Sequence, residues 1–442
     1  MHSTSLQARV TILELAAAGH SDRAIAERLS WSLATVRKWR RRGQRQGRSG
    51  LVSRLGRPPT GALSSFPAPV RQAVRTWRRQ HPGWGPRTLV AEAQRAADLA
   101  GQRVPRRSIL AQWLHDERLT RRYQRQRRLP QPVAESAQAA HAAWEMDAYG
   151  ALPVPAVGMV SLINLTDCFS RVKLLSFPCW VGDQQVQRHP DTLDYLLALR
   201  LACLDWGLPG QLRVDRDSVF FDNTSKSPFP TRLHLFLLGL DVALVIGPPH
   251  QPQQRTITER NHQTWDQQVL CGQQFADWDA LWQALDARRD FLNRALPCRG
   301  SDDLPPLLAH PQAATPRRPY TPSQEPHLFD VARIENYLGQ GQWFRQASNV
   351  GTITLGDQHY GLGQTWAKHE VQITYPPAEH GLVFLDHDGQ RTQQRPIKGL
   401  SYPELAGDLG RLLQLHPCQL ALPFAWPDQR VIRLSRTLSD TT

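Results

Sequence analysis

Long apolar runs are scarce in this 442-residue chain. The most apolar stretch, residues 233–246, is interrupted by Asp241 and falls short of the ~20 residues that a helix needs to cross a bilayer. The first residues include His2, Ser3 and Gln7 in place of a basic segment followed by an apolar one, so we expect no signal peptide. The sequence therefore predicts that the chain is not a membrane protein, and its hydrophobic content of 40% argues against wholesale disorder.

Cysteine is also rare, and no cysteine forms a C-x-x-C pair or lies near a histidine at the spacing of a zinc finger. The six cysteines are Cys168, Cys179, Cys203, Cys271, Cys298 and Cys418. Their spacing argues against a disulfide-rich scaffold and against a structural zinc site. We expect free thiols in a reducing cytoplasm.

Lysine is the third scarce residue, with five lysines among 53 basic side chains. The arginines are concentrated near the N-terminus: residues 1–140 hold 27 Lys and Arg against 8 Asp and Glu, a net charge of +19, and the other 302 residues hold 26 against 31, a net charge of −5. Arginine-rich blocks suit contact with phosphate groups. A GC-rich genome would also favour arginine codons, so the uneven distribution is the stronger indication of an N-terminal region that binds nucleic acid.

The length predicts two to four domains, and the first fifty residues predict three short helices. Ser21 is the expected N-cap of the second helix, and Gly43 is the expected end of the third. Two short helices, a tight turn and a basic final helix are typical of a helix-turn-helix DNA-binding domain. The predicted DNA-contacting residues of this final helix are Thr35, Arg37, Lys38, Arg40 and Arg41. The alternative is a plain three-helix bundle with a solvated basic face.

A linker rich in Gly, Ser, Pro and Arg follows, in which Arg57 is a candidate for contact with a DNA minor groove unless the segment is only a spacer. A second helical unit then has a basic helix start at Arg106, Arg107 and Ser108, which we interpret as a second helix-turn-helix. A small packing domain is the alternative.

From residue 144 the pattern changes to that of a mixed α/β sheet. Strands are expected at 144–149, 159–165, 172–177, 211–214 and 242–246, and helices at 192–204, 233–240, 258–270 and 277–294. Beyond a Pro-rich linker, short strands at 351–355, 359–362, 371–375 and 382–385 predict a small β-barrel.

Three acidic residues occupy special positions in this pattern. Asp147 lies within the first strand, Asp215 directly follows the fourth, and Glu259 opens a helix. Neighbouring strands can bring the two aspartates side by side, with the helix laid over them. Converging carboxylates repel one another unless a cation neutralises them, and Mg²⁺ prefers oxygen ligands. A pair of such ions ~3.5–4 Å apart suits in-line phosphoryl transfer.

The order of these residues resembles the catalytic core of insertion-sequence DDE transposases, which belong to the retroviral-integrase superfamily. The resemblance is carried by Trp144-x-x-Asp147, Asp167-Cys168-Phe169-Ser170-Arg171, Gly207-Leu208-Pro209 before Asp215, Pro252 with Glu259-Arg260-Asn261-His262, Asn293, and Tyr320-Thr321-Pro322-Ser323. It covers roughly residues 5–385, and the motifs are specific in combination more than one by one.

The resemblance implies an RNase H-like core in which Asp147, Asp215 and Glu259 bind two Mg²⁺ ions, for which Mn²⁺ can substitute. It implies hydrolysis at the transposon ends and joining of the freed 3′-hydroxyl to target DNA, with no covalent enzyme intermediate. Arg260 and His262 would hold DNA phosphates near the metals, an assignment balanced against a solvated helix face. The implied partners are double-stranded DNA (transposon ends and target) and further copies of the chain, with an accessory ATPase left open and no membrane. The implied location is the prokaryotic cytoplasm, in association with the nucleoid.

The sequence departs from the family pattern at several points. Asp215-Arg216-Asp217 replaces the common Asp-Asn-Gly, and Asp215 is preferred as ligand because it directly follows the apolar strand. The 44 residues from Asp215 to Glu259 exceed the usual gap, which the polar segment 222–230 would explain as a surface loop. Arg255-Thr256 stand where the family has Asn-Gly, and no His-His-Cys-Cys zinc module precedes the core. Asp167 is expected to cap a turn or to pair with Arg171.

The expected architecture is multidomain, with N-terminal all-α helix-turn-helix units, a central α/β RNase H-like catalytic core and a C-terminal small β-barrel. The expected domains are a helix-turn-helix at 1–48, a linker at 49–69, a second helix-turn-helix at 70–130, the integrase core at 140–300, a Pro-rich linker at 301–327, the β-barrel at 328–400 and an irregular tail at 401–442. Two other functions stay open: a domesticated, inactive transposase that acts as a sequence-specific DNA-binding regulator, and an RNase H-like nuclease or junction resolvase.

Overall fold

The computed structural model describes residues 5–52, 61–120, 137–155, 157–183, 185–223, 225–247, 256–386, 389–407, 421–425 and 431–433. For residues 256–259, 421–425 and 431–433 it describes the backbone alone. The chain divides into two compact units, residues 1–66 with 112–119 and residues 67–111 with 120–442.

The first unit contains the N-terminal helices α1 (Leu6–Ala17), α2 (Asp22–Leu29) and α3 (Leu33–Gln46), followed by the 3₁₀ turn η1 (Gly47–Leu51). Their core is built from Ile12, Ile25, Val36, Trp39 and Leu51, all buried. The predicted N-cap is confirmed, since the Ser21 hydroxyl accepts a hydrogen bond from the amide of Ala24 at 3.2 Å.

The prediction that the third helix ends at Gly43 is wrong, because α3 continues to Gln46. Gly43 is buried inside the helix, and a Cβ at this position would lie 2.5 Å from both methyl carbons of Leu13 in α1. The glycine therefore allows α1 and α3 to approach closely. Any larger side chain at this position would hold the two helices apart, and this steric cost exceeds the entropic cost of a glycine within a helix.

The second unit begins with helices α4 (Ala68–Gln80) and α5 (Pro86–Arg95), which pack through Val70, Ala93 and Leu99. The 3₁₀ turn η2 (Ala97–Leu99) follows, and α6 spans Arg107–Asp116.

A mixed five-stranded sheet in the order β3-β2-β1-β4-β5 forms the centre of the second unit. The strands are β1 (Ala143–Val154), β2 (Gly158–Asp167), β3 (Lys173–Gly182), β4 (Gln211–Val214) and β5 (Ala243–Ile246). The first three pair antiparallel, whereas β4 is parallel to both β1 and β5. All five were expected near these positions, because each is an apolar run bounded by turn residues.

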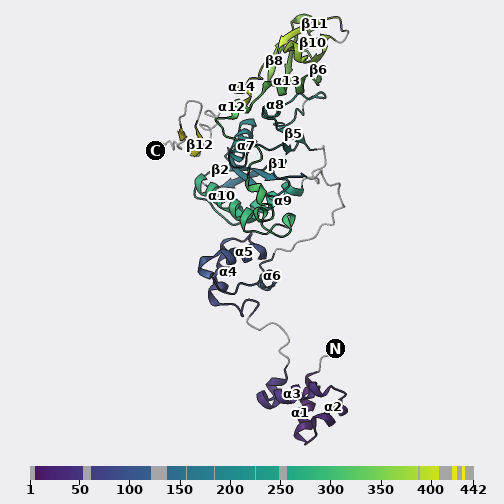
Figure 1. Ribbon diagram of the computed structural model, residues 1–442, viewed down its shortest axis with the longest axis vertical. Coiled ribbons are helices and arrows are strands. Elements are labelled where there is room, and N and C mark those ends of the chain that lie inside the picture. Colours follow the sequence, from purple (N-terminus) through teal and green to yellow (C-terminus); the bar gives the residue numbers. More distant parts are fainter. Residues whose placement is uncertain are drawn as a thin grey trace. The chain divides into compact units, whose positions relative to one another are not determined.

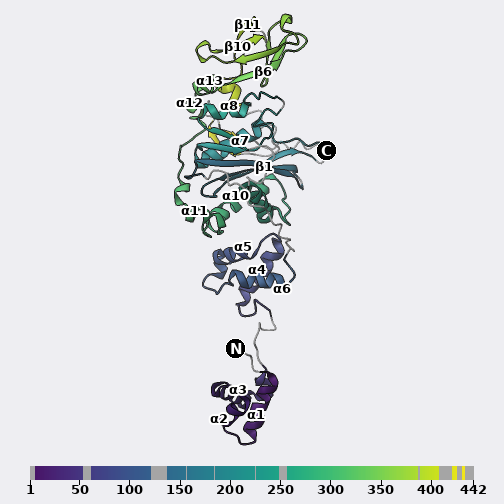
Figure 2. The ribbon, with the colours of Figure 1, turned by 90° about the vertical axis from the view of Figure 1, so that its right-hand side faces the viewer.

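Helices cover both faces of this sheet (Figures 1 and 2), with α7 and α8 on one side and α9 and α10 on the other. Their bounds are α7 (Thr192–Trp206), α8 (Arg232–Gly239), α9 (Thr256–Trp265) and α10 (Trp278–Arg294). The stretch predicted as one helix over 258–270 is α9 continued by η4 (Asp266–Leu270), a single π-helical turn. Beyond α10 come the short elements η5 (Arg299–Ser301), α11 (Pro306–Ala309), η6 (Pro311–Ala314) and α12 (Glu325–Leu328).

The C-terminal strands form an open sheet and a separate hairpin within the described residues, so the predicted closed barrel is not confirmed. The sheet has the order β11-β10-β9-β6, and the hairpin pairs β7 with β8. The bounds are α13 (Val331–Leu338), β6 (Gln342–Gln346), β7 (Thr352–Leu355), β8 (Gln358–Gly361), η7 (Gln364–Trp366), β9 (Glu370–Thr374), η8 (Pro377–Glu379), β10 (Gly381–Asp386) and β11 (Thr392–Pro396).

The prediction that residues 401–442 are irregular is wrong for three segments. Helix α14 (Tyr402–Ala406) has a capping box between Ser401 and Glu404, and β12 (Ala421–Ala425) pairs with β13 (Val431–Arg433). The segment 222–230, expected to be a surface loop, is instead partly packed: Phe229 is buried and contacts Trp343 of β6.

The five described cysteines form no disulfide. Within the described ranges, no helix combines the length and the apolar character that crossing a bilayer requires.

Candidate functional site

The pairing of β1 with β4 aligns the two aspartates that the sequence singled out. The parallel register matches Ala143 with Gln211 and Glu145 with Arg213. Asp147 and Asp215 each lie two residues beyond the last paired positions of these two strands. Along one strand, residues i and i+2 point to the same face of the sheet. Adjacent strands lie about 4.8 Å apart. Both aspartates therefore lie near the point where the short β4 ends.

The phenol of buried Tyr195 in α7 interacts electrostatically with three aspartates of this region. Burial raises the pKa of its phenol, and the charges of Asp217, Asp147 and Asp215 raise it further. The side chain of Asp147 is 20% exposed, and its carboxylate accepts the amide of Ala148 at 2.9 Å. The carboxylate of Asp215 accepts the amide of Asp217 at 3.0 Å.

Asp217, the neighbouring acid, is occupied by its own turn. Its carboxylate accepts the amide of Val219 at 3.0 Å and the hydroxyl of Ser218 at 3.2 Å. Asp215 directly follows the last residue of β4, whereas Asp217 lies two residues further along the chain. Asp215 therefore differs from Asp217 in following β4 directly.

Helix α9 carries Glu259 and lies against β1. The side chain of Glu259 is outside the described residues, but its helix is anchored by Asn261, whose amide donates to Thr166 of β2 at 3.0 Å in a buried bond. His262 places Nε2 3.8 Å from a carboxylate oxygen of Asp147 and stacks near Tyr149, with ring centroids 4.8 Å apart. Arg260, which lies between Glu259 and Asn261 in the sequence, is exposed.

The donor set of this edge fits a hard divalent cation. Two carboxylates held on one face by neighbouring strands repel each other, and a bound cation relieves that repulsion. Among the described side chains, no three His, Cys, Asp or Glu residues form a ready cluster for a metal ion, and Glu259, the expected third ligand, is not among them.

Asp167, by contrast, has a structural role and is fully buried. Its carboxylate accepts the amide of His141 at 2.9 Å, and the amide and hydroxyl of Ser170 at 2.8 and 2.6 Å. The prediction of a turn cap is confirmed.

The basic residues predicted to contact DNA on α3 differ in their surroundings. Arg37, Lys38 and Arg41 are exposed. Arg40 is paired with Asp22 of α2 at 2.7 Å, and the same aspartate lies 3.8 Å from Nε of Arg37. The remaining predicted contact, Thr35, is half-buried, and its hydroxyl lies 2.8 Å from that of Ser32, the N-cap residue of α3.

The other predicted DNA contacts lie in or beside the second helical unit. Arg106, Arg107 and Ser108 are exposed at the start of α6, where backbone amides and basic side chains both suit a phosphate. Arg57 lies outside the described residues.

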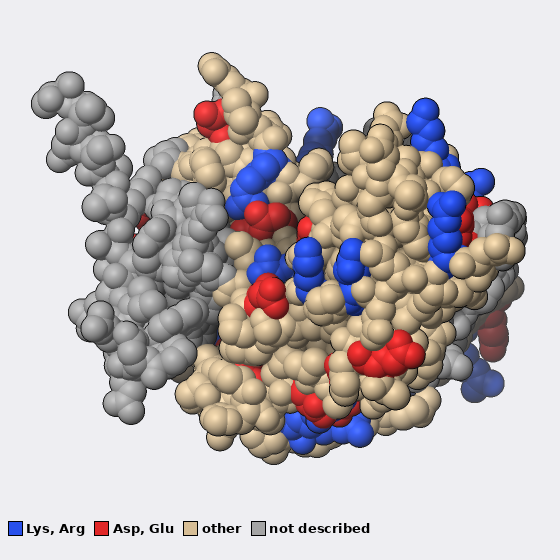
Figure 3. Space-filling view, turned by 90° about the horizontal axis from the view of Figure 1, so that it is seen from above, with Lys and Arg blue, Asp and Glu red and all other residues tan. Residues whose placement is uncertain are grey.

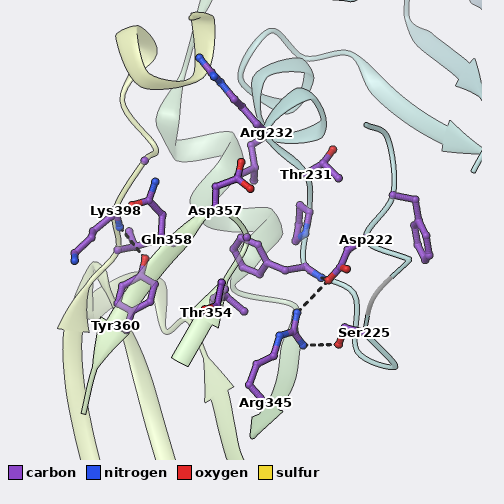
Figure 4. A pocket seen from close by; sticks show the side chains of 18 of the residues that line it. Asp222, Ser225, Thr231, Arg232, Arg345, Thr354, Asp357, Gln358, Tyr360 and Lys398 are labelled. Atoms are coloured by element: carbon purple, nitrogen blue, oxygen red, sulfur yellow. Dashed lines mark hydrogen bonds and ion pairs between the residues drawn. The ribbon is translucent and has the colours of Figure 1, made fainter. Parts of the chain in front are cut away.

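A cleft of about 1260 Å³ separates the segment after β4 from the C-terminal strands (Figure 4). Arg345 of β6 crosses it to Asp222 at 3.2 Å and to the hydroxyl of Ser225 at 2.7 Å. Its charged lining is balanced: Lys226, Arg232, Arg345 and Lys398 face Asp191, Asp222, Asp357 and Glu404. The surface in Figure 3 likewise shows basic and acidic side chains interspersed. This mixture does not favour a polyanion, so we assign the cleft no DNA.

Two residues near the candidate site have no sequence signature. Gln268 in η4 and Arg288 in α10 join the turn between α4 and α5 to the helix that carries Glu259. The π-helical turn has tertiary contacts with α5 and α10, and no local pattern in the sequence predicts it.

Comparison with known proteins gives one family match and several distant structural likenesses. Residues 3–52 match the family of Homeodomain-like domains, which is consistent with a helix-turn-helix DNA-binding function for this part of the chain. A simian T-cell lymphotropic virus intasome in complex with PP2A regulatory subunit B56 gamma is 14% identical, with a TM-score of 0.33, over 75% of this chain and 97% of that chain.

Two integrase catalytic cores are similar over a shorter range. The HTLV-2 core in complex with magnesium is 12% identical, with a TM-score of 0.29, over 39% of this chain and 98% of that chain. The BIV core is 17% identical, with a TM-score of 0.27, over 39% of this chain and 96% of that chain. Each is a distant likeness, and none assigns a function to this chain.

Proposed function

We propose that the chain is a DDE transposase with an RNase H-like core, which binds the terminal inverted repeats of a transposon, cleaves their 3′ ends and joins them to target DNA. The observation that supports it most is the parallel pairing of β1 with β4, because its register, if continued by two residues, would match Asp147 with Asp215, and α9, which carries Glu259, lies against β1. The N-terminal homeodomain-like match and the exposed arginines of α3 support DNA recognition.

Asp147, Asp215 and Glu259 would hold two Mg²⁺ ions, or Mn²⁺ in their place. Bound there, the ions would activate the attacking oxygen and stabilise the leaving oxygen of an in-line displacement. Asn261 fixes α9 to the sheet, and His262 beside Asp147 restricts the orientation of that carboxylate. Arg260 is exposed and would contact a phosphodiester near these residues. The enzyme would act as a homo-oligomer on paired ends.

The test is strand transfer by the full chain on DNA carrying the inverted repeats that bracket the gene. Asp147→Asn, Asp215→Asn and Glu259→Gln should each lower the rate by about 10³-fold or more, because each removes a charge that the metals need. Asp217→Asn is the matched control and should stay within about threefold of wild type, because a metal ligand is worth several kcal/mol and a turn cap about one.

Three outcomes would contradict the proposal. Full activity in the three variants would remove the catalytic assignment. A wild-type chain that binds the ends yet transfers no strand would instead be a DNA-binding regulator. Cleavage of branched DNA or of RNA–DNA hybrids without end specificity would indicate a nuclease or resolvase.

A further inference from the structure

The turn between α4 and α5 docks directly on the π-helical turn that continues α9. Gly83 approaches it so closely that a Cβ would lie 2.1 Å from the carbonyl oxygen of Gln267. The indole of Trp84 donates to the carbonyl oxygen of Gln268 at 3.4 Å, and the side chain of Gln273 donates to the carbonyl oxygen of Gln80 at 2.6 Å. The contact thus combines a close backbone approach at Gly83 with side-chain donors to backbone carbonyl oxygens.

Gln268 is the central residue of this contact. Its side-chain amide donates to the hydroxyl of Thr88 in α5 at 3.2 Å. Its side-chain oxygen accepts two hydrogen bonds from Arg288 of α10, at 2.7 and 3.2 Å. One side chain of η4 therefore joins the second helical unit to a helix of the core.

Arg288 completes the connection in a largely buried position, with its side chain 11% exposed. Its guanidinium pairs with Glu92 of α5 at 2.5 Å and lies over the rings of Trp84 and Phe291, 4.3 and 3.9 Å from their centroids. Burial lowers the pKa of Arg288. An arginine buried in this way holds its partners in one geometry, because leaving its donors unpaired is costly.

Because the π-helical turn directly continues α9, the docking of the α4–α5 turn on η4 affects the position of α9. The backbone of Trp265 is α-helical, so α9 and η4 are one continuous stretch, and a shift of η4 moves the helix that carries Glu259 and His262. A π-helical turn is an unfavourable insertion that tertiary contacts must stabilise, and such turns are frequent at functional sites.

We propose that Gln268 and Arg288 form a latch through which the docked α4–α5 turn sets the position of α9, so that the second helical unit positions the catalytic helix as well as contacting DNA. Gln268 and Arg288 are positioning residues in this view, and they do not touch the reacting atoms. The inference rests on the proposed function for its catalytic consequence, whereas the mechanical link can be measured without activity.

The test compares Gln268→Ala with Gln268→Glu and Arg87→Ala in the full chain. Gln268→Ala removes the latch. Gln268→Glu keeps the acceptor for Arg288 and should rescue. Arg87→Ala removes contacts of the same interface away from η4, with Pro297 at 2.9 Å and Asp303 at 2.7 Å, and is the matched control. Gly83→Ala, which pushes the turn off η4, is the second disrupting variant.

Gln268→Ala should lower kcat for strand transfer about 10- to 100-fold at unchanged KM for end DNA, because a misplaced catalytic group costs rate more than binding. In the absence of DNA, hydrogen exchange of the amides in residues 256–265 should accelerate in Gln268→Ala and Gly83→Ala, but not in Gln268→Glu or Arg87→Ala.

Unchanged exchange and kcat in Gln268→Ala would overturn the latch, as would an equal loss of kcat in Arg87→Ala. If the wild type transfers no strand, the proposed function fails and the exchange pattern alone decides on the latch. Accelerated exchange with undiminished kcat in an active enzyme would overturn the positioning role.

Discussion

Burial also sets the protonation of single side chains outside the candidate site. His234 of α8 is 9% exposed and packs edge to face against Tyr337, with ring centroids 5.2 Å apart. Burial lowers the pKa of His234 to about 4. The folded protein binds a proton at His234 more weakly than the unfolded chain does. Protonation at low pH therefore favours the unfolded chain, and the folded state is favoured while the ring stays neutral.

His234 should therefore make the second unit acid-sensitive. Its contribution is fully present above pH 6.5 and is lost as the pH falls toward 4, by at most about 3 kcal/mol. His234→Phe keeps a ring in place and should flatten the dependence of the unfolding midpoint on pH between these values. The exposed His327→Phe is the control. An unaltered pH dependence in His234→Phe would refute the assignment.

At the scale of elements, α3 shows how a basic helix divides its arginines. Asp22 of α2 pairs with Arg40 and so holds the Arg40 side chain against α2. Lys38 and Arg41 stay exposed. A cation that already has a carboxylate partner gains less from a phosphate than one that is solvated.

Replacing Arg41 by alanine should weaken DNA binding by the full chain and reduce the slope of log affinity against log salt by about one, because one phosphate contact is lost. Arg40→Ala should change the slope less and should lower the thermal stability of the first unit instead. Binding to duplex DNA measured over a range of salt concentrations distinguishes the two. Equal slopes for both variants and wild type would rule out phosphate contact at Arg41.

Elements with a strong apolar pattern were predictable from the sequence, and those without one were not. The strands around Asp147 and Asp215 are apolar runs, and the candidate pair follows from their order. Strand β11 (Thr392–Pro396) is polar throughout, and β6 has adjacent Trp343 and Phe344 in place of alternation, so neither was predicted. The pairing of Arg40 with Asp22 and the latch at Gln268 depend on contacts between distant segments, which local patterns do not encode.

At the scale of the whole molecule, one buried ion pair connects the sheet-covering helix α7 to the chain beyond it. Arg200 donates to Glu325 at 2.6 and 2.8 Å, and both side chains are less than 5% exposed. Tyr320 and Tyr402 also donate to Glu325, and Arg200 reaches the carbonyl oxygen of Ala406 at 3.2 Å. The network joins residues up to 206 positions apart in the sequence.

Glu325→Gln should destabilise the second unit by about 3–5 kcal/mol, because it leaves the buried Arg200 without its countercharge. Urea unfolding followed by tryptophan fluorescence measures the loss. Arg200→Met combined with Glu325→Gln should recover much of it, since no buried charge then remains. A cost below about 1 kcal/mol for the single variant would show that the pair is not essential.

This network also orders events during synthesis. A ribosome releases the chain from its N-terminus, so α7 emerges long before Glu325 and Ala406. Until Glu325 has been synthesised, Arg200 lacks the carboxylate with which it pairs in the folded structure. The buried network that holds α7 is therefore completed later in synthesis than the strands β1, β2 and β3, which precede α7 in the chain.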